Sequence, residues 1–267
     1  MSNTSTPCIH PYGNAPISVA SLSETGVHPR HVIVAGAGGG IGNALCAEMS
    51  VQFPGIKLTR LTRNPHRLEK IAALTRDLSL DMNRPEQFEN TVSRLAPIPG
   101  PDWIFVTSGW LHDEETMPER TFREMEANHL ERSFRVNAVG PALLIRHLAE
   151  RFKQVDTLKI GVLSARLGSI SDNRLGGWHA YRASKAALNM LIRNLAIEMA
   201  RSKPNWCIAG LQPGTTDTPL SRPFQRGMRT QLHSPKDTAQ RLIRIMQSMG
   251  SEHSGYLYDR EGIPFQP

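Results

Sequence analysis

The chain has 267 residues, 39% of them hydrophobic, which is enough for one α/β domain with a substantial core. Its formal net charge of +7 invites a nucleic-acid hypothesis, but the basic residues are scattered and aromatic residues make up only 6%, so nucleic-acid binding is disfavoured. Three cysteines without metal-ligand spacing and no apolar run approaching about 20 residues predict a cytoplasmic protein with no metal site and no membrane span.

The first thirty residues differ in composition from the rest. Residues 1–30 are rich in Ser, Thr, Pro and Gly, and they lack the charged start and apolar core of a signal peptide. We therefore expect a flexible N-terminal extension, followed by one folded domain over residues 31–267.

Apolar runs and helical patterns alternate along this domain. Strands are predicted at residues 31–35, 56–62, 79–82, 102–107, 158–164, 206–211 and 256–258. Helices are predicted at residues 41–52, 66–74, 85–95, 131–152, 179–201 and 235–249. This alternation favours a doubly wound, Rossmann-type α/β domain, with a mainly parallel sheet of about seven strands flanked by helices.

A glycine-rich turn follows the first predicted strand. The strand Val32-Ile33-Val34 leads into Ala35-Gly36-Ala37-Gly38-Gly39-Gly40-Ile41-Gly42, and an apolar helix follows. Glycines allow the backbone to turn sharply and to approach a pyrophosphate, whose charge then meets the helix N-terminus. The strand, turn and helix together predict a dinucleotide site at Gly36, Gly40, Ile41 and Gly42.

The end of the second predicted strand bears on the choice of cofactor. Residues 59–65 contain no Asp or Glu to bind a ribose 2′-hydroxyl, whereas Arg63 could pair with a 2′-phosphate. The alternative is an arginine on the surface with no ligand. The segment favours NADP(H), with NAD(H) possible.

Tyr181 and Lys185 form the motif with the most direct chemical meaning. Four residues apart on a predicted helix, they lie on one face of it, and a fixed cation near a phenol favours the phenolate. We therefore expect Lys185 to lower the pKa of Tyr181 from its usual value of about 10. The alternative is a solvated helix edge, because this spacing is common on helix surfaces.

The glycine turn, the Tyr181/Lys185 pair and their order resemble those of the short-chain dehydrogenase/reductases. Ser-Ala-Arg-Leu-Gly-Ser-Ile, followed by Gly-Gly-Trp and Tyr-Arg-Ala-Ser-Lys, is similar to the C-factor-like and sniffer-like carbonyl reductase branch. The resemblance covers nearly everything from Val32 to the C-terminus. It adds further site residues, namely Asp81 and Met82 beside adenine, Gly109 near the adenosine ribose, Asn137 in catalysis, and Pro213, Gly214, Thr216 and Thr218 over the nicotinamide.

The resemblance implies an NADP(H)-dependent enzyme that interconverts a carbonyl and an alcohol. Hydride would pass between C4 of the nicotinamide and the carbonyl carbon, and Tyr181 would transfer the proton. Lys185 would also bind the nicotinamide ribose, and Asn137 would support the proton path. Homo-oligomerisation through the two long helices is implied as well. From the residues alone, Asn137 could be a polar residue inside a helix, Asp81 a strand end, and the two threonines turn formers.

One position departs from the family pattern at the expected catalytic serine. An ungapped alignment of residues 160–168 places Ala165 there. Ser164 is adjacent, but strand alternation aims it at the opposite face, and Ser169 lies farther along the loop. The loss of one polarising hydrogen bond costs a few kcal/mol of transition-state stabilisation. The chain could therefore be a weaker reductase, or a cofactor-binding sensor with little turnover.

The sequence identifies the substrate only in outline. Residues 110–126, 171–178 and 220–231 are expected to flank the pocket, and they mix apolar groups such as Trp178 and Phe224 with charged ones. We therefore expect a partly apolar small molecule. His112 and His179 have no metal-ligand spacing, and we interpret them as solvated or capping residues.

Overall fold

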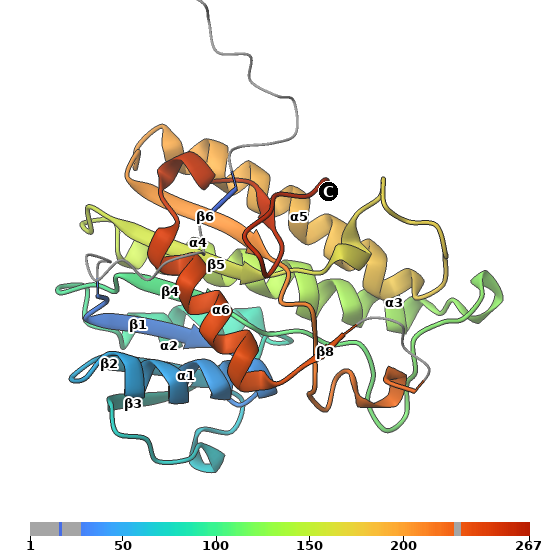
Figure 1. Cartoon of the computed structure of the whole chain (residues 1–267), viewed down its shortest axis with the longest axis horizontal. Coiled ribbons are helices and arrows are strands. Elements are labelled where there is room, and N and C mark those ends of the chain that lie inside the picture. The colour runs from blue at the N-terminus through green and yellow to red at the C-terminus, as the bar shows by residue number, and fades with distance from the viewer. Residues whose placement is uncertain (1–15, 18–27, 227–230) are drawn as a thin grey trace, which may run out of the picture.

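A computed structural model describes residues 16–17, 28–226 and 231–267 of the chain. Its central sheet has seven parallel strands in the order β3-β2-β1-β4-β5-β6-β9 (Figure 1). The strands are β1 His31–Ala35, β2 Lys57–Thr62, β3 Leu74–Ser79, β4 Trp103–Val106, β5 Leu158–Leu163, β6 Trp206–Leu211 and β9 Leu257–Tyr258. A separate pair joins β7 Thr215–Thr216 and β8 Leu232–His233. The expected doubly wound α/β architecture is confirmed.

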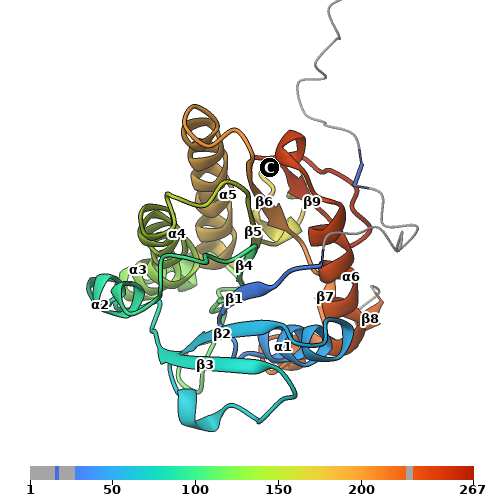
Figure 2. The same cartoon turned by 90° about the vertical axis from the view of Figure 1, so that its left-hand side faces the viewer.

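Helices cover both faces of the sheet (Figure 2). On one side lie α1 Gly40–Gln52 and α6 Pro235–Ser248; on the other lie α2 Phe88–Ser93, α3 Ala127–Phe134, α4 Gly140–Arg151 and α5 His179–Ala200. Short 3-10 helices occupy Pro65–Arg67, Pro85–Gln87, Phe122–Glu124, Arg166–Gly168, Arg222–Phe224 and Ser251–His253. None of the helices in the described ranges combines the length and the apolar character that crossing a bilayer requires.

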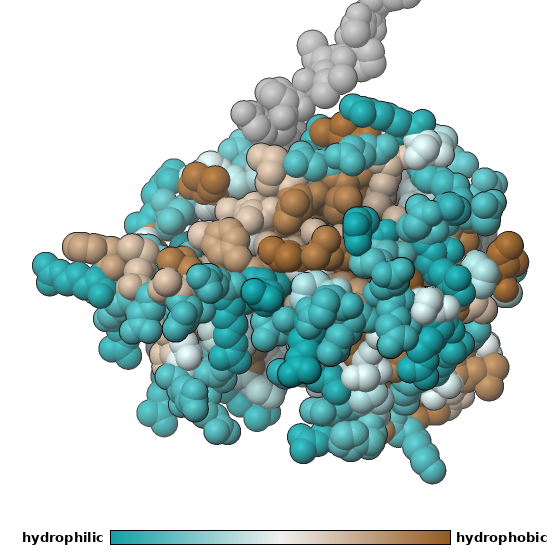
Figure 3. Space-filling view, turned by 180° about the vertical axis from the view of Figure 1, so that it is seen from behind, coloured by the Kyte–Doolittle hydropathy of each residue, from teal (hydrophilic) through white to brown (hydrophobic). Residues whose placement is uncertain are grey.

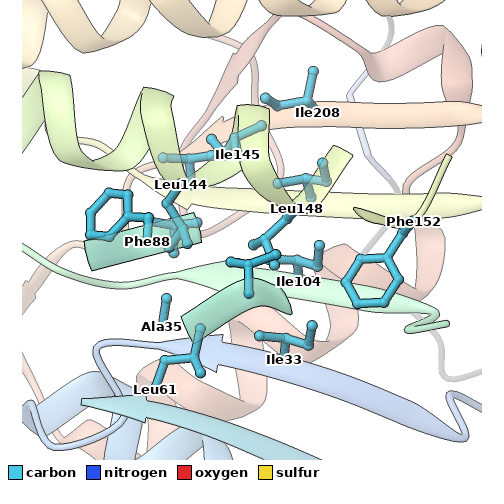
Figure 4. Close-up of a cluster of buried hydrophobic side chains, with 14 of the residues drawn as sticks. Ile33, Ala35, Leu61, Phe88, Ile104, Leu144, Ile145, Leu148, Phe152 and Ile208 are labelled. Atoms are coloured by element: carbon cyan, nitrogen blue, oxygen red, sulfur yellow. The ribbon is translucent and has the colours of Figure 1, made fainter. Parts of the chain in front are cut away.

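Strand alternation divides the hydrophobic core into two layers. In β1, Ile33 and Ala35 pack with α2, α4 and α5, whereas Val32 and Val34 pack with α1 and α6. Successive side chains of a strand point to opposite faces, so a strand covered on both sides is apolar throughout. Figure 4 shows the first layer, in which Leu144, Ile145 and Leu148 of α4 lie over Ile33 and Ile104. The core therefore fixes the strands whose ends form the site.

The strand order creates a switch point beside β1. The chain runs from β1 outward through β2 to β3, then returns to the other side of β1 as β4. In open parallel sheets, ligands bind outside the carboxyl ends of the strands at such a point. The ends of β1 and β4, at Ala35 and Val106, therefore mark the expected binding edge.

The region around the third strand differs from the sequence prediction. The third strand spans Leu74–Ser79 instead of residues 79–82, and no helix fills residues 66–74, where a 3-10 helix is followed by a loop. β3 is an edge strand with largely exposed residues, so its polar segment Thr75-Arg76-Asp77 lacks a strand-like apolar pattern. The apolar residues just beyond it, Leu80 and Met82, are buried at 4% and 5% exposure without being part of the strand.

The predicted long helix over residues 131–152 is two helices joined by a π-helical turn. Helix α3 ends at Phe134, the π turn spans Arg135–Val139, and α4 begins at Gly140. π turns inside helices frequently mark functional sites. This turn contains Asn137.

Ile17, within the predicted N-terminal extension, contributes to the fold. Ile17 is only 2% exposed within the second core layer, and its N–H donates to the carbonyl of Gly262 at 2.8 Å. Residues 1–15 and 18–27 of the predicted flexible extension lie outside the described part of the chain. Ile17 itself packs in the core, and the flexibility of the extension stays a prediction.

Candidate functional site

The glycine turn forms a tight cradle at the end of β1. Gly36 has a φ of +91°, and a Cβ on it would stand 2.6 Å from Oγ1 of Thr107. A Cβ on Gly40, which opens α1, would stand 2.5 Å from the methyl group of Thr218. The segment after β6 thus reaches the start of α1. The turn has room for backbone only, as a site where main chain approaches a pyrophosphate requires.

A polar cavity of about 430 Å³ lies beyond this cradle, at the ends of β2 and β3. Its lining comprises Arg63, Asn64, Ser79, Asp81, Arg84 and Gln87. Sequence reasoning found Arg63 and Asp81 but missed Arg84, which follows β3 by five residues. The cavity therefore contains two guanidinium groups suited to a phosphate.

The neighbouring arginine of β2 has a different task. Arg60 is 3% exposed, and its Nε donates to Oδ1 of Asp77 at 2.7 Å, with a second contact of 2.7 Å from Nη2 to Oδ2. Strand register places the two residues opposite each other in β2 and β3. This bidentate pair joins the edge strand to the sheet. Of Arg60, Arg63 and Arg67, only Arg63 lines the cavity.

Tyr181 and Lys185 lie together in the first turns of α5. Their exposures are 9% and 3%, and the Lys185 ammonium donates to the carbonyl of Leu163 at the end of β5, at 2.9 Å. Nζ of Lys185 lies 5.9 Å from the centre of the Tyr181 ring. The alternative of a solvated helix edge is therefore wrong: both groups are buried at the carboxyl edge of the sheet.

The pKa of Tyr181 departs from the sequence expectation. Burial raises the pKa of Tyr181 to about 12 and lowers the pKa of Lys185 to about 8. In both cases removal from water disfavours the charged form. Desolvation is the cause of both shifts, and the phenol keeps its proton at neutral pH.

Asn137 connects the site to the helix that carries Tyr181. Its Oδ1 accepts from the Trp110 N–H at 2.7 Å, and its Nδ2 donates to the Trp110 carbonyl at 2.8 Å. Nδ2 also lies 3.1 Å from Oγ of Ser184, which donates to the carbonyl of Tyr181 at 2.8 Å. Asn137 thus links Trp110, which follows Gly109 in the loop after β4, to α5.

The two serines near Ala165, which stands at the expected catalytic serine position, form hydrogen bonds with other residues. Ser164 donates to Oδ1 of Asn189 at 2.6 Å. Ser169 accepts from the N–H of Asp172 at 3.2 Å within its own turn. Neither contact brings a hydroxyl to the place of Ala165, so the structure supplies no obvious substitute from these two residues.

The segment after β6 closes the site over residues 213–218. Gly214 has a φ of +74°, and Pro213 precedes it at the end of the sheet. The hydroxyl of Thr216 lies 2.9 Å from that of Thr238 in α6 and is therefore engaged there. Thr218 is 8% exposed and packs against Gly40.

Aromatic side chains gather next to Tyr181. The ring centre of Trp178 lies 6.4 Å from that of Tyr181 and 4.7 Å from that of Phe224. His112 lies 5.5 Å from Phe224, and its Nε2 is 3.1 Å from the carbonyl of Leu220. Three segments expected to flank the pocket therefore meet here, although residues 227–230 of the third lie outside the described chain.

These residues fit a dinucleotide cofactor. The glycine cradle would hold the pyrophosphate, and Arg63 and Arg84 would meet a phosphate on the adenosine side. Asp81 shares their cavity, whereas Met82 belongs to the core. Within the described ranges, no three His, Cys, Asp or Glu side chains are grouped to hold a metal ion.

Comparisons with known proteins place this chain in a family. The family model described as short chain dehydrogenase matches residues 30–229. The C-signal of Myxococcus xanthus is 30% identical over 132 residues, which cover 49% of this chain and 74% of that protein. The 1-hydroxy-2-glutathionyl-2-methyl-3-butene dehydrogenase of Rhodococcus sp. (strain AD45) is 28% identical over 198 residues, or 73% of this chain and 81% of that one.

Solved structures share the fold. The carbonyl reductase Sniffer of D. melanogaster superposes with a TM-score of 0.74 at 18% identity, covering 89% of this chain and 99% of that one. An NADPH-bound carbonyl reductase from chicken fatty liver superposes with a TM-score of 0.75 at 19% identity, covering 89% of this chain and 94% of that one. At such identities the likeness establishes the architecture.

Proposed function

This chain belongs to the short-chain dehydrogenase family and is an NAD(P)-dependent oxidoreductase, and from that premise we propose that it reduces a ketone or aldehyde with NADPH, using Tyr181 as the proton donor. The observation that carries the proposal is the burial of Tyr181 and Lys185 side by side on α5, beside the end of β5. Arg63, Arg84 and the glycine turn supply the matching cofactor site.

The protonation state of Tyr181 favours the reductive direction. When bound, NADPH supplies a hydride. A phenol whose pKa is raised to about 12 remains protonated at neutral pH and can give its proton to the developing alkoxide. In the opposite direction the same residue would have to begin as phenolate, which is scarce at this pKa. The protonated phenol is the form that reduction requires, which is consistent with the reductase activity that we propose.

Lys185 and Asn137 support the proton donor. The Lys185 ammonium, fixed on the carbonyl of Leu163, places positive charge near the Tyr181 ring and stabilises the phenolate left after proton transfer. Asn137 holds the π turn against the loop after β4 and is joined to α5 through Ser184. Asn137 therefore keeps the helix and the loop in register on either side of the substrate.

Substitution of Tyr181 tests the chemistry. Tyr181→Phe removes the transferable proton, and we expect NADPH oxidation to fall to background with a panel of aromatic and aliphatic carbonyls, while NADPH still binds. Tyr258→Phe is the matched control, because Tyr258 is also buried but lies on β9 with its hydroxyl unpaired. Equal turnover in wild type and Tyr181→Phe would sink the mechanism. Tight NADPH binding without turnover in wild type would favour the sensor.

Charge reversal in the cavity tests the choice of cofactor. We expect Arg63→Asp to weaken NADPH binding strongly and NADH binding little, because only NADPH carries the 2′-phosphate. Arg67→Asp makes the same charge change at an exposed neighbour outside the cavity and serves as control. Titration by fluorescence gives both affinities. Wild-type affinity for NADH equal to that for NADPH would contradict the assignment.

Homo-oligomerisation is a second part of the proposal. The molecular face behind the view of Figure 1, where α3, α4 and α5 lie, shows hydrophobic side chains gathered across it (Figure 3). Met190 and Ile197 of α5 are 62% and 46% exposed. We infer that a second copy covers this surface. Light scattering of wild type against Met190→Glu tests it, and a wild-type monomer at micromolar concentration would refute it.

A further inference from the structure

A buried carboxylate lies at the start of the helix that carries Tyr181. Glu119 is 2% exposed, although it belongs to the loop between β4 and α3. The N–H of Ala180 donates to its two carboxylate oxygens at 3.2 and 3.3 Å, and the N–H of Trp178 donates to its backbone carbonyl at 2.6 Å. One residue thus holds the first turn of α5 at two points.

The local sequence of α5 cannot cap its own N-terminus. The N-cap residue is Trp178, whose side chain offers no acceptor, and no N-cap side-chain hydrogen bond is formed. Trp178 also has a φ of +50°, unique among the non-glycine residues that the structure describes. The first turn of a helix leaves its N–H groups without intrahelical partners. Glu119 accepts from two of them, and its charge is favourable at a helix N-terminus.

The close approach that makes these contacts possible depends on Gly177. A Cβ on this residue would stand 3.3 Å from the carbonyl of Arg120 and 3.4 Å from that of Glu119. Gly177 has a φ of +64°, which other residues seldom adopt. The glycine turn before α5 and the loop containing Glu119 are therefore matched to each other.

Glu119 also connects to the other side of the site. Nδ1 of His129 on α3 lies 3.5 Å from its Oε1, and the ring of His129 packs edge-on against Trp110 at 5.0 Å. The backbone of Trp110 is bound by Asn137, which reaches α5 again through Ser184. The contacts close a ring from the start of α5 through the loop after β4 and back to α5.

We propose that Glu119 is a positioning residue for proton transfer, which holds Tyr181 in register with the loop after β4 by clamping the first turn of α5. The inference rests on the proposed function of Tyr181. Tyr181 is the residue directly after Ala180, so release of the clamp displaces the phenol, whereas the glycine cradle and the Arg63 cavity lie on other elements. Loss of Glu119 therefore affects the chemical step more than cofactor binding.

Three measurements on purified full-length variants test this role. For Glu119→Ala we expect kcat to fall by about a hundredfold, as for misplacement of a reacting group by about 1 Å, with the KM for NADPH within about twofold. Glu119→Gln retains an oxygen acceptor for Ala180 and recovers most of the loss. Hydrogen exchange of residues 178–186 should accelerate in Glu119→Ala and remain close to wild type in Glu119→Gln.

Asp102 provides the matched control. Like Glu119, Asp102 binds backbone N–H groups with its carboxylate, which accepts from Arg30 at 2.7 Å and from His31 at 2.9 Å, but Asp102 precedes β4, at the amino end of the strands. Asp102→Ala should destabilise the protein without lowering kcat, when kcat is calculated from the concentration of protein that binds NADPH. Equal loss of kcat in Asp102→Ala and Glu119→Ala would reduce Glu119 to a stability role and overturn the inference.

The readouts separate this inference from the proposed function. If the wild type fails to oxidise NADPH with every carbonyl tested, the proposed function is refuted. Even then, unchanged hydrogen exchange of residues 178–186 in Glu119→Ala would overturn the clamp. Wild-type kcat in Glu119→Ala, alongside an inactive Tyr181→Phe, would reject the clamp and leave the function standing. If Glu119→Ala does not fold, Glu119→Asp, whose side chain is one methylene shorter, should show the same loss of kcat. A wild-type kcat in Glu119→Asp would overturn the inference.

Discussion

Replacing Lys185 with methionine removes an ammonium group that the fold keeps 3% exposed. Burial lowers the pKa of Lys185 from 10.5 to about 8, which corresponds to about 3 kcal/mol of destabilisation of the folded state while the lysine is protonated. Methionine has a similar length and no charge. It leaves the carbonyl of Leu163 without its donor, a loss of roughly 1–3 kcal/mol. We therefore expect Lys185→Met to be inactive and yet about as stable as wild type, or more stable, at pH 7.

The sign of the pH dependence follows from the pKa of Lys185 in the folded and in the unfolded chain. Below pH 8 Lys185 is protonated in both, so the buried ammonium destabilises the folded state by its full amount. Between pH 8 and 10.5 the unfolded chain binds more protons, so the wild type gains stability as pH rises. Lys185→Met lacks this gain. The stability advantage of the variant over wild type should thus shrink by about 2 kcal/mol between pH 7 and 9.5.

Urea denaturation followed by circular dichroism at pH 7, 8, 9 and 9.5 measures this difference. Subtraction of the two curves removes the shared contributions of other groups, including Cys46 and Cys207, whose pKa values burial raises to about 12. Lys236→Met, at a lysine that is 72% exposed, is the control and should give a flat difference. A difference that is also flat for Lys185→Met would refute the claim that desolvation controls the Lys185 ammonium.

Three further substitutions have expected outcomes. Ala165→Ser restores a hydroxyl at the end of β5 and should retain or raise kcat for carbonyl reduction, by up to about a hundredfold; a fall in kcat at unchanged stability would contradict the alignment. Arg60→Ala leaves the Asp77 carboxylate without its bidentate partner and should lower the free energy of unfolding by about 3 kcal/mol, without changing the ratio of NADPH to NADH affinity. Ile17→Ala should cost about 2–4 kcal/mol in urea denaturation, because the side chain is buried at 2% exposure, and an unchanged midpoint would show that the N-terminal contact adds nothing.

Features that depend on local chemistry could be predicted from the sequence. The apolar strand His31–Ala35, its glycine turn and the following helix are placed within one residue of the prediction, because glycine conformation and β-branched side chains act locally. The four-residue spacing of Tyr181 and Lys185 likewise gave their common helix face. Strand and helix alternation sufficed for the doubly wound fold.

The contacts of the polar groups, in contrast, depend on how distant parts of the chain pack together. Arg60 and Arg63 lie in the same sequence segment but have different surroundings. Strand register pairs Arg60 with Asp77, whereas Arg63 lies beyond the end of the strand and lines the cavity. The Tyr181 pKa rises instead of falling, since the extent of burial depends on packing from distant elements. Glu119 caps a helix 61 residues away, a contact that no local pattern encodes because helix capping requires only an acceptor in the right place in space.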